Sequence, residues 1–460
     1  MLAVIAILML AAALIQGSSY WPGIITWDAI NQYEQALSGV YDDWHPPAMA
    51  WLWRQLIRIH PGAAPMYLIQ LGLYWTGYAL LIASAIRLRR RRAAILVALC
   101  AVMPFPLAIM GAVLKDCLMQ GLLLTAVGLY AWSGPDRRWG VRLIAMLLLF
   151  CAGLLRFNAF LATVPLLVAL LPIHWRRSPL RMAMTSVIAT IAVMASMPLA
   201  NKAIGADDSD VRLSLVIFDL GGITLHSGVD MFPAIGVANP VAVNACCYRP
   251  EKWDFYSSWA DPPCPISFDR IDAKVTETGV NAYVLLARAI IAHPIAYAQH
   301  RLAHFNINTR FLVHDEVQGP APDRAIDNDW GFVVPSNAGL RTITHLANGS
   351  THSPLGWPIW WIALSGGLLA LSSAPSSTLP SRWLIVPLTA STFAYGMGYL
   401  VFSVSSELRY HLWTVTGTAI AAAFLIADIM GGAAVPRRRL YLALAPAVIV
   451  GLLCAIWRIT

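Results

Sequence analysis

The chain alternates long apolar stretches with short polar segments from one end to the other. A helix needs about 20 mostly apolar residues to cross a bilayer, so these stretches predict membrane-spanning helices. The fifth and sixth stretches are short and only 156–158 separates them, so they are either two tilted half-length helices or two shortened spans. The eleven predicted spans cover 1–17, 66–86, 93–109, 117–132, 141–155, 159–172, 182–200, 355–371, 384–401, 411–429 and 440–457.

The composition agrees with a membrane protein and excludes the other broad classes. Apolar residues make up 58% of the 460 residues and charged residues only 12%, whereas soluble domains carry about 25% charged residues. The mean hydropathy is +0.62, so there is too little polar surface to cover a water-soluble particle. The sequence predicts an all-α polytopic membrane protein and excludes disordered, collagen-like and disulfide-rich secreted chains.

The basic residues fix the predicted orientation. Arginines gather in five segments that alternate in parity with the spans, so all five fall on one face, which the positive-inside rule makes the cytoplasm. That face holds 15 basic and 2 acidic residues, and the rest of the chain holds 17 basic and 22 acidic residues. The net charge of +8 is therefore an orientation signal and does not indicate nucleic acid as a partner. The arginines of the five segments are Arg87, Arg89, Arg90, Arg91 and Arg92; Arg137, Arg138 and Arg142; Arg176, Arg177 and Arg181; Arg382; and Arg437, Arg438 and Arg439.

Two long segments lie on the opposite face and define the predicted domains. An N-terminal membrane module over 1–203 contains the first exported loop, 18–65. An extracytoplasmic loop domain follows over 204–354, and the remaining membrane helices occupy 355–460. We expect the first stretch to be retained as an anchor. In the loop domain, Cys264 is expected to form one disulfide with either Cys246 or Cys247, since an exported segment permits it.

Polar residues that interrupt the apolar pattern gather on the predicted exported face. A charge at the membrane boundary is costly and usually serves a partner or a cavity, so it is a functional candidate. The candidates come from the first exported loop and from three outer turns between spans. They are Asp28, Asp42, Asp43 and His45; Lys115 and Asp116; Arg156 and Asn158; and Glu407, Arg409 and Tyr410.

These residue types suit transfer of a group from a lipid-linked phosphate. Lys115, Arg156 and Arg409 can give charge-assisted hydrogen bonds to phosphate oxygens. A carboxylate beside them can act as a general base on an acceptor hydroxyl, and we assign that role to Asp28, with Asp43 or Asp116 as helper. Together they predict glycosyl transfer from a polyprenyl-phosphate sugar, with the remaining candidates binding substrate.

Each candidate also has a structural alternative. Asp28 is a favoured residue to cap the helix that follows it, and Asp42–Asp43 can form a turn before the proline pair. Arg156 can reach the lipid headgroups with its long side chain. The adjacent charges Lys115 and Asp116 can neutralise each other, as can Glu407 and Arg409. The pair His300 and His304, one helical turn apart, could bind a metal, although a polar helix face is the simpler interpretation.

The order of these motifs resembles the GT-C superfamily of integral membrane glycosyltransferases, of the protein mannosyltransferase and aminoarabinose transferase type. The resemblance rests on Asp28 followed by His45-Pro46-Pro47, on Lys115-Asp116, on Arg156-x-Asn158 and on Glu407-x-Arg409-Tyr410. It covers roughly 1–200 and 355–430. It implies a GT-C-like helical bundle, a polyprenyl-phosphate sugar donor, inversion at the sugar, and Asp28 as catalytic base or metal ligand. Relatives often carry two adjacent acids there, but Ala29 follows Asp28, so a divalent cation such as Mg²⁺ or Mn²⁺ is left open as a cofactor.

The expected partners are a lipid-linked sugar donor, a cell-envelope acceptor (a lipid, glycan or protein) and the lipid bilayer. The expected location is the bacterial inner membrane, with the active site facing the periplasm. Two alternatives stay open, an O-antigen polymerase or ligase and a lipid or polysaccharide transporter (flippase). The sequence names neither the sugar nor the acceptor.

Overall fold

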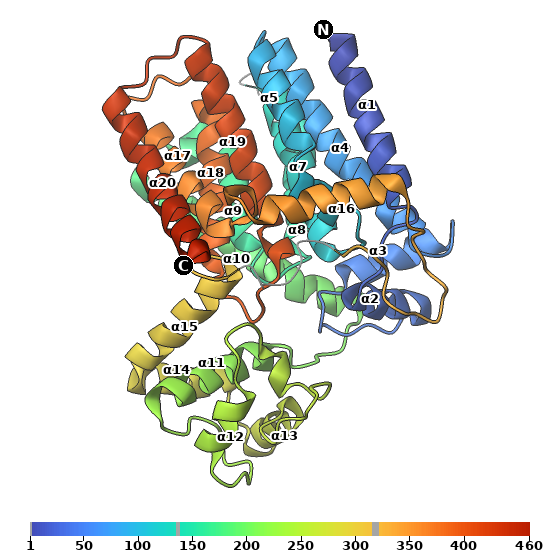
Figure 1. Ribbon diagram of the computed structural model, residues 1–460, viewed down its shortest axis with the longest axis vertical. Helices are drawn as coiled ribbons and strands as arrows, with labels where there is room; N and C mark the ends of the chain where they lie inside the picture. Colours follow the sequence, from blue (N-terminus) through green and yellow to red (C-terminus); the bar gives the residue numbers. More distant parts are fainter. Residues whose placement is uncertain (1, 135–138, 315–321) are drawn as a thin grey trace. The chain divides into compact units, whose positions relative to one another are not determined.

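The computed structural model describes residues 2–134, 139–314 and 322–460, and every regular element in these ranges is a helix. The chain divides into two compact units (Figure 1). The first comprises residues 1–207, 318–397 and 408–456, and the second comprises 208–317, 398–407 and 457–460. The all-α class expected from the sequence is therefore observed in the described part of the chain.

The first unit contains most of the apolar helices. In chain order its helices are α1 (Leu2–Ser19), α2 (Trp27–Ser38), α3 (Ala48–Ile57), α4 (Ala64–Arg87), α5 (Arg91–Ala101), α6 (Pro104–Ile109), α7 (Lys115–Ser133), α8 (Trp139–Gly153), α9 (Phe160–Leu170), η1 (Ile173–Arg176), α10 (Pro179–Ile204), α16 (Ala338–Thr351), η3 (Pro354–Gly356), α17 (Pro358–Ser373), α18 (Arg382–Gly398), η4 (Leu408–His411), α19 (Leu412–Met430) and α20 (Arg437–Ile459).

Each of the eleven predicted spans overlaps a helix, but the helices differ in length. Among the residues that the structure describes, four helices are long and apolar enough to cross a membrane, namely α4, α10, η4 with α19, and α20. The count rises to five if α13 (Phe268–Thr278) and α14 (Ala282–Ala292) of the second unit, bent by 103°, are taken as one span. The protein is thus a multi-pass membrane protein, while the count of eleven spans and their orientation stay predictions.

Three predicted spans are broken or short in the structure. The stretch 93–109 forms α5 and α6 with a break before Pro104, because proline disfavours helical backbone at the preceding residue. The ambiguous pair forms two separate helices, α8 and α9, of 15 and 11 residues. At 1.5 Å per residue these measure about 22 and 16 Å, less than the roughly 30 Å of a bilayer core.

Helix α7 is central to the first unit and is buried along almost its whole length. Glycines let it approach α4 closely: an added Cβ at Gly77 would come within 2.8 Å of Leu124 Cβ, and one at Gly128 within 2.8 Å of Gly77 O. Small residues at such crossings are the usual way for membrane helices to pack. The Thr125 hydroxyl then donates to the backbone oxygen of Leu73 at 2.7 Å. This packing holds the N-terminus of α7, where Lys115 and Asp116 lie.

At the end of the bundle predicted to face the cytoplasm, three segments meet around one buried carboxylate. Asp428 accepts hydrogen bonds from Arg90 Nη1 at 2.9 Å, from Ser381 N at 2.7 Å and from Ser381 Oγ at 2.9 Å. The three residues come from segments that the sequence assigned to one face. These hydrogen bonds compensate the buried negative charge of Asp428 and link the three segments.

Helix α16 packs on α1 and α6, so the segment just before α17 lies in the first unit. Asn337 caps α16 through the N–H of Leu340 and donates to Ser19 O at 2.8 Å. The sequence predicted a loop domain over 204–354 that includes this segment. In the structure, only residues 208–317 of that range belong to the second unit.

The second unit is built around α11 (Arg212–Ser227), which contacts α12 (Pro240–Cys247), η2 (Trp253–Tyr256), α13, α14 and α15 (Pro294–Asn308). Cys247 and Cys264 form a disulfide with a Cα–Cα distance of 5.8 Å, which settles the partner of Cys264. Cys246 is free and exposed.

A buried polar network lies inside the second unit. His300 Nε2 lies 2.8 Å from Asp219 Oδ1, and Arg301 Nη2 lies 2.5 Å from the same oxygen. The other histidine, His304, bonds Pro250 O at 2.7 Å and Ser403 Oγ at 2.9 Å. Both histidines are therefore hydrogen-bonded residues in the core of the second unit.

Candidate functional site

Five separate segments of the first unit bring charged and polar side chains to one place. They are the first turn of α2, the loop before α3, the first turn of α7, the turn before α9, and η4. We call the six ionisable residues they contribute the charged cluster. Its members are Asp28, His45, Lys115, Asp116, Arg156 and Arg409.

Asp28 is the centre of one half of the charged cluster. Arg409 Nη1 donates to Asp28 Oδ2 at 2.8 Å, and Lys115 Nζ lies 3.5 Å from the same oxygen. His45 Nε2 lies 3.7 Å from Asp28 Oδ1. The Asp28 side chain is 21% exposed, compared with 2% for Asp116. It is therefore the carboxylate of the cluster that solvent or a ligand can reach.

The backbone around Asp28 explains its position. Helix α2 begins at Trp27, and Thr26 is its N-cap, so Asp28 belongs to the first turn and does not itself cap the helix. An acidic residue there is favoured by the partial positive charge at the N-terminus of a helix. One face of α2 buries Ala29, Tyr33 and Ala36. This burial directs Asp28 to the other members of the cluster.

The surrounding cations keep Asp28 ionised. Burial opposes ionisation and raises the pKa of the carboxyl, but the charges of Arg409 and Lys115 and the neighbouring His45 outweigh burial. The net result holds the pKa of Asp28 well below its ordinary value. Asp28 is thus a carboxylate at every physiological pH.

His45 is neutral in this setting. Its ring is mostly buried, and together with the charge of Lys115 this lowers the pKa of His45 to about 3. Lys115 Nζ lies 2.6 Å from His45 Nδ1, so the ammonium donates and the neutral ring accepts. The pair Pro46-Pro47 follows directly, and Pro47 is the N-cap of α3, which fixes where the ring leaves the backbone.

Asp116 is the centre of the other half. Arg156 forms an ion pair with Asp116 Oδ1, and Arg409 Nη1 lies 3.7 Å from Asp116 Oδ2. Arg156 Nε also donates to Asn158 Oδ1 at 3.4 Å. The Tyr410 ring lies 4.2 Å from the guanidinium carbon of Arg156, at a distance typical of a cation–π contact. Lys115 therefore does not neutralise its neighbour Asp116 by direct pairing, because each side chain has partners elsewhere.

The charge balance of the cluster favours an anionic ligand. Three cations, Lys115, Arg156 and Arg409, face two carboxylates, so the cluster has an excess of one positive charge. Beside it, the buried donor Asn158 Nδ2 lacks a hydrogen-bond partner. Leaving a buried polar atom unpaired is costly. An anion with several oxygens would neutralise the excess charge and give a partner to a buried donor such as the Asn158 amide.

Both carboxylates of the charged cluster are paired with arginine, and a divalent cofactor stays a prediction. Asp28 and Asp116 are each bound to arginine, and His45 Nδ1 is directed at Lys115. Within the described residues, His, Cys, Asp and Glu side chains form no group of three or more that could hold a metal ion. Divalent metals such as Mg²⁺ require several oxygen ligands.

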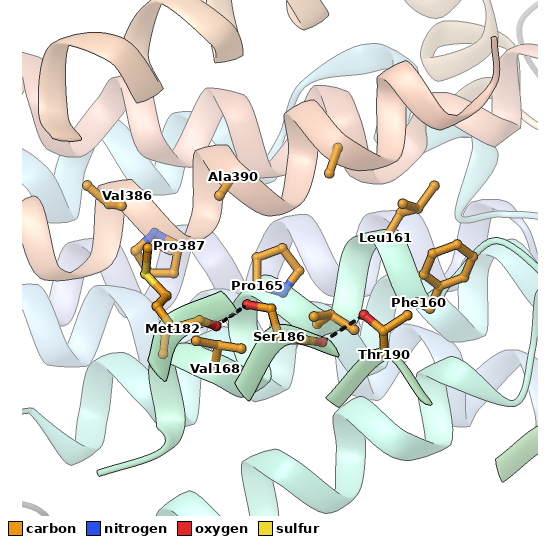
Figure 2. Close-up of a pocket in the computed structure, with 13 residues that line it drawn as sticks. Phe160, Leu161, Pro165, Val168, Met182, Ser186, Thr190, Val386, Pro387 and Ala390 are labelled. Atoms are coloured by element: carbon orange, nitrogen blue, oxygen red, sulfur yellow. Dashed lines mark hydrogen bonds between the residues drawn. The ribbon is translucent and has the colours of Figure 1, made fainter. Parts of the chain in front are cut away.

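An apolar groove begins next to the cluster. It is a cavity of about 420 Å³ between α9, α10 and α18, and its first lining residue, Phe160, follows Asn158 by two positions. Figure 2 shows Pro165 and Pro387 facing it from α9 and α18. The groove is lined by Phe160, Leu161, Val164, Pro165, Val168, Ala169, Met182, Ser186, Thr190, Val386, Pro387, Ala390 and Ala394.

The two hydroxyls in the groove do not make it polar. Ser186 Oγ donates to Met182 O and Thr190 Oγ1 donates to Ser186 O, both at 2.8 Å and both within α10, as Figure 2 shows. Their hydrogen-bonding capacity is thus directed to the backbone of their own helix. The groove runs along α9 for about 14 Å, the rise of nine helical residues. Its shape and chemistry suit an unbranched or isoprenoid hydrocarbon chain.

Four predicted site residues are not members of the charged cluster. Asn158 and Tyr410 contact its member Arg156, and the other two are Asp43 and Glu407. Asp43 pairs through its backbone N–H with Asp207 O at 3.0 Å. The neighbouring Asp42 accepts from Trp44 N at 2.9 Å, a contact of the turn that was the structural alternative, and the role of Asp43 stays a prediction. Glu407 ends the segment 398–407 of the second unit. The apolar groove was not predicted; the prolines inside apolar helices, Pro165 and Pro387, were the signal in the sequence that could have indicated it.

Comparisons with known proteins give one similar structure. The chain is similar to ArnT from Cupriavidus metallidurans, whose crystal structure contains bound undecaprenyl phosphate, over 92% of this chain and 77% of that one. The two are 14% identical with a TM-score of 0.33, which is too low to support a conclusion about fold or function. No protein-family model and no curated protein matches the chain.

Proposed function

We propose that this protein is a membrane glycosyltransferase that moves a sugar from a polyprenyl-phosphate donor to a hydroxyl of a cell-envelope lipid, glycan or protein. The observation that carries the proposal is the charged cluster, with its excess positive charge and its reachable carboxylate, beside a groove for a hydrocarbon chain. A polyprenyl phosphate has the matching parts, because it joins an anionic head to a long apolar tail.

The phosphate of the donor would bind between Arg409, Lys115 and Arg156. Guanidinium groups bind phosphate oxygens in pairs, and the lysine adds a point charge. Two of these cations now contact Asp28, so binding of a phosphate would draw them away from the carboxylate. Asp28 would lose the charges that lower its pKa and would become a stronger base once the donor is in place. The donor tail would then occupy the groove between α9, α10 and α18.

The reaction would be a single displacement at the anomeric carbon. The acceptor oxygen attacks that carbon while Asp28 takes the hydroxyl proton, and the bond from carbon to phosphate oxygen breaks. The electron pair of that bond leaves with the polyprenyl phosphate, and Lys115, Arg156 and Arg409 stabilise its charge. Attack opposite to the leaving group inverts the sugar configuration. Asp116 would be a positioning residue, because it is buried and holds Arg156 and Arg409 in place.

The cellular setting extends the proposal. With the arginine-rich segments in the cytoplasm, the charged cluster faces the extracytoplasmic side, which in a bacterial inner membrane is the periplasm. Sugar phosphates attached to lipid are the donors available there, since nucleotide sugars stay in the cytoplasm. This side also gives access to the growing cell envelope as the acceptor.

Donor binding can be tested before the sugar is known. The probes are undecaprenyl phosphate and undecaprenol, which have the same tail and differ in the phosphate. Native mass spectrometry of the purified protein should show retention of undecaprenyl phosphate and weak or no retention of undecaprenol. An Arg156→Gln, Arg409→Gln double variant should lose the difference, while Arg439→Gln on the predicted cytoplasmic side should keep it. Equal retention of both lipids by the unmodified protein would refute the assignment of the cluster to phosphate.

The sugar is then identified from the cell. Mass spectrometry of envelope glycans and lipids from a deletion strain should show the loss of one sugar unit, whose mass gives the class of the donor. Purified protein with that donor should form a covalent product. Transport of the lipid across vesicles without any covalent product would instead support the transporter alternative.

A further inference from the structure

Helices α14 and α15 of the second unit each expose large apolar side chains, which we together call the apolar row. The exposed fractions are 80% for Ile291, 75% for Ile295 and 60% for Leu302, with Val284 at 45%. Val284 and Ile291 are seven residues apart on α14, and Ile295 and Leu302 are seven apart on α15. Two helical turns separate residues at this spacing, so each pair lies on one side of its helix.

The opposite sides of the same helices are already buried. Leu286 and Ala289 of α14 and Ala296 of α15 are buried where these helices pack on α11. Helix α14 is thus apolar on both sides, and Arg288 is its one charged residue. A helix that is apolar all round belongs in a hydrophobic environment on every side. Packing within the second unit supplies that environment on one side only.

These helices are too short to cross a bilayer. Helix α14 has 11 residues and α15 has 15, which correspond to about 16 and 22 Å, compared with roughly 30 Å for the bilayer core. Helix α13 does not continue α14 in a straight line, because the two are bent by 103°. Helix α13 also carries charged residues on most of its turns, including Asp269, Lys274 and Glu277. The apolar row therefore fits a position in the plane of a membrane interface.

We propose that the exposed apolar row of α14 and α15 lies in the lipid interface of the bilayer that the protein spans. The partner is within reach, because the candidate span α10 ends at Ile204 and the second unit begins at Asp208. Four extended residues reach at most about 14 Å. Tyr283, 51% exposed, and the exposed Arg288 border the row with side chains that suit the headgroup region. Interfacial helices bury one apolar face about 5–10 Å into the lipid boundary.

A quenching experiment on the full chain tests this proposal. A Cys100→Ala, Cys151→Ala, Cys246→Ser background keeps the Cys247–Cys264 disulfide and the two buried cysteines. A single NBD fluorophore is attached in turn at Ile291→Cys, at Leu302→Cys and at Thr276→Cys, an exposed polar position on α13 that serves as the matched control. The labelled proteins are reconstituted in phosphatidylethanolamine and phosphatidylglycerol vesicles. Quenching is measured with doxyl-labelled phospholipid and with aqueous iodide.

The proposal expects doxyl lipid to quench positions 291 and 302 at least three times more strongly than position 276, with iodide showing the reverse order. Iodide quenching at 291 and 302 equal to that at 276 would place the row in water. Quenching by neither reagent would show that protein covers the row. Either result would overturn the proposal. The use of two independent positions guards against a local disturbance at one of them.

Discussion

Arg409 Nη1 donates to Asp28 Oδ2 at 2.8 Å across 381 positions of sequence. The same nitrogen lies 3.7 Å from Asp116 Oδ2. Arg409 thus bridges two carboxylates that stand in the first turns of α2 and α7. One guanidinium links the reachable acid of the charged cluster to its buried acid, and both halves of the proposed donor site depend on it.

Replacement of Arg409 should impair transfer strongly. In Arg409→Gln, the leaving phosphate loses a charged donor, and removal of one such group commonly costs about 10²–10³ in rate. We expect kcat/KM with the identified donor to fall by about 10²-fold or more. Arg439→Gln, an exposed arginine at the predicted cytoplasmic end, is the control and should stay within about twofold. A fall of less than about threefold at Arg409 would contradict its role at the phosphate.

Filling the apolar groove should discriminate between donors by tail length. Ala390 lines the groove from α18, so Ala390→Phe should obstruct a long chain while leaving the charged cluster intact. We expect KM to rise about tenfold for a donor of eleven isoprene units and to change little for one of two units. Leu147→Phe, at a 63% exposed position on α8, should affect neither donor. Equal effects on both donors would remove the groove from tail binding.

The neutral histidines predict how stability depends on pH. His45 and His304 have native pKa values of about 3, compared with the ordinary value of 6.5. Between those values the unfolded state binds more protons than the native state, so stability falls as the pH falls below about 6.5. Each group contributes a slope of about 1.4 kcal/mol per pH unit. Above about 6.5 both contributions are fully present and constant.

Thermal unfolding of the protein in detergent measures this dependence. Between pH 7 and 8, His45 and His304 should not change the melting temperature. Between pH 6.5 and 5, the melting temperature should decrease as the pH falls. Asp28 adds to the decrease only below its ordinary pKa of 3.8, since its native pKa is lower still. His45→Asn should reduce the dependence of stability on pH by up to about 1.4 kcal/mol per pH unit, the contribution of one proton. A slope that His45→Asn leaves unchanged would show that the ring titrates normally.

Removal of divalent metal should leave transfer intact. Both carboxylates of the charged cluster are bound to arginine, so a metal would have to displace those contacts before it could bind. We expect transfer to proceed at an unchanged rate after incubation with EDTA, provided the donor and acceptor do not themselves need a metal. Loss of activity with EDTA and recovery with Mg²⁺ or Mn²⁺ would show that the cluster rearranges around an ion.

The pattern of spans and basic loops was enough to place several distant residues together. Asp28, Lys115, Arg156 and Arg409 follow different helices, but loop parity put them all on one face, and they meet in the structure. The exact partners could not be predicted in this way. Asp116 pairs with Arg156 and not with its neighbour Lys115, because the first turn of α7 directs adjacent side chains to different sides.

Asp43, Pro104 and the groove show where sequence reasoning reached its limit. Asp43, like Asp28, is an acidic residue in the first predicted exported loop. Its backbone pairs with Asp207, however, and no local sequence pattern predicts this tertiary contact. The break before Pro104 splits a stretch whose hydropathy is continuous. The groove arises where α9, α10 and α18 fail to fill the space between them, and this depends on helix packing and not on any single motif.

The most direct measurement is sugar transfer by the Asp28→Asn variant with the identified polyprenyl-phosphate donor. Asparagine keeps the size of the side chain but cannot take a proton from the acceptor. The account predicts a loss of transfer of about 10³-fold or more, with folding and undecaprenyl phosphate retention preserved, while Asp43→Asn stays close to the unmodified enzyme. Transfer by Asp28→Asn within about threefold of the unmodified enzyme would contradict the central claim that Asp28 is the base.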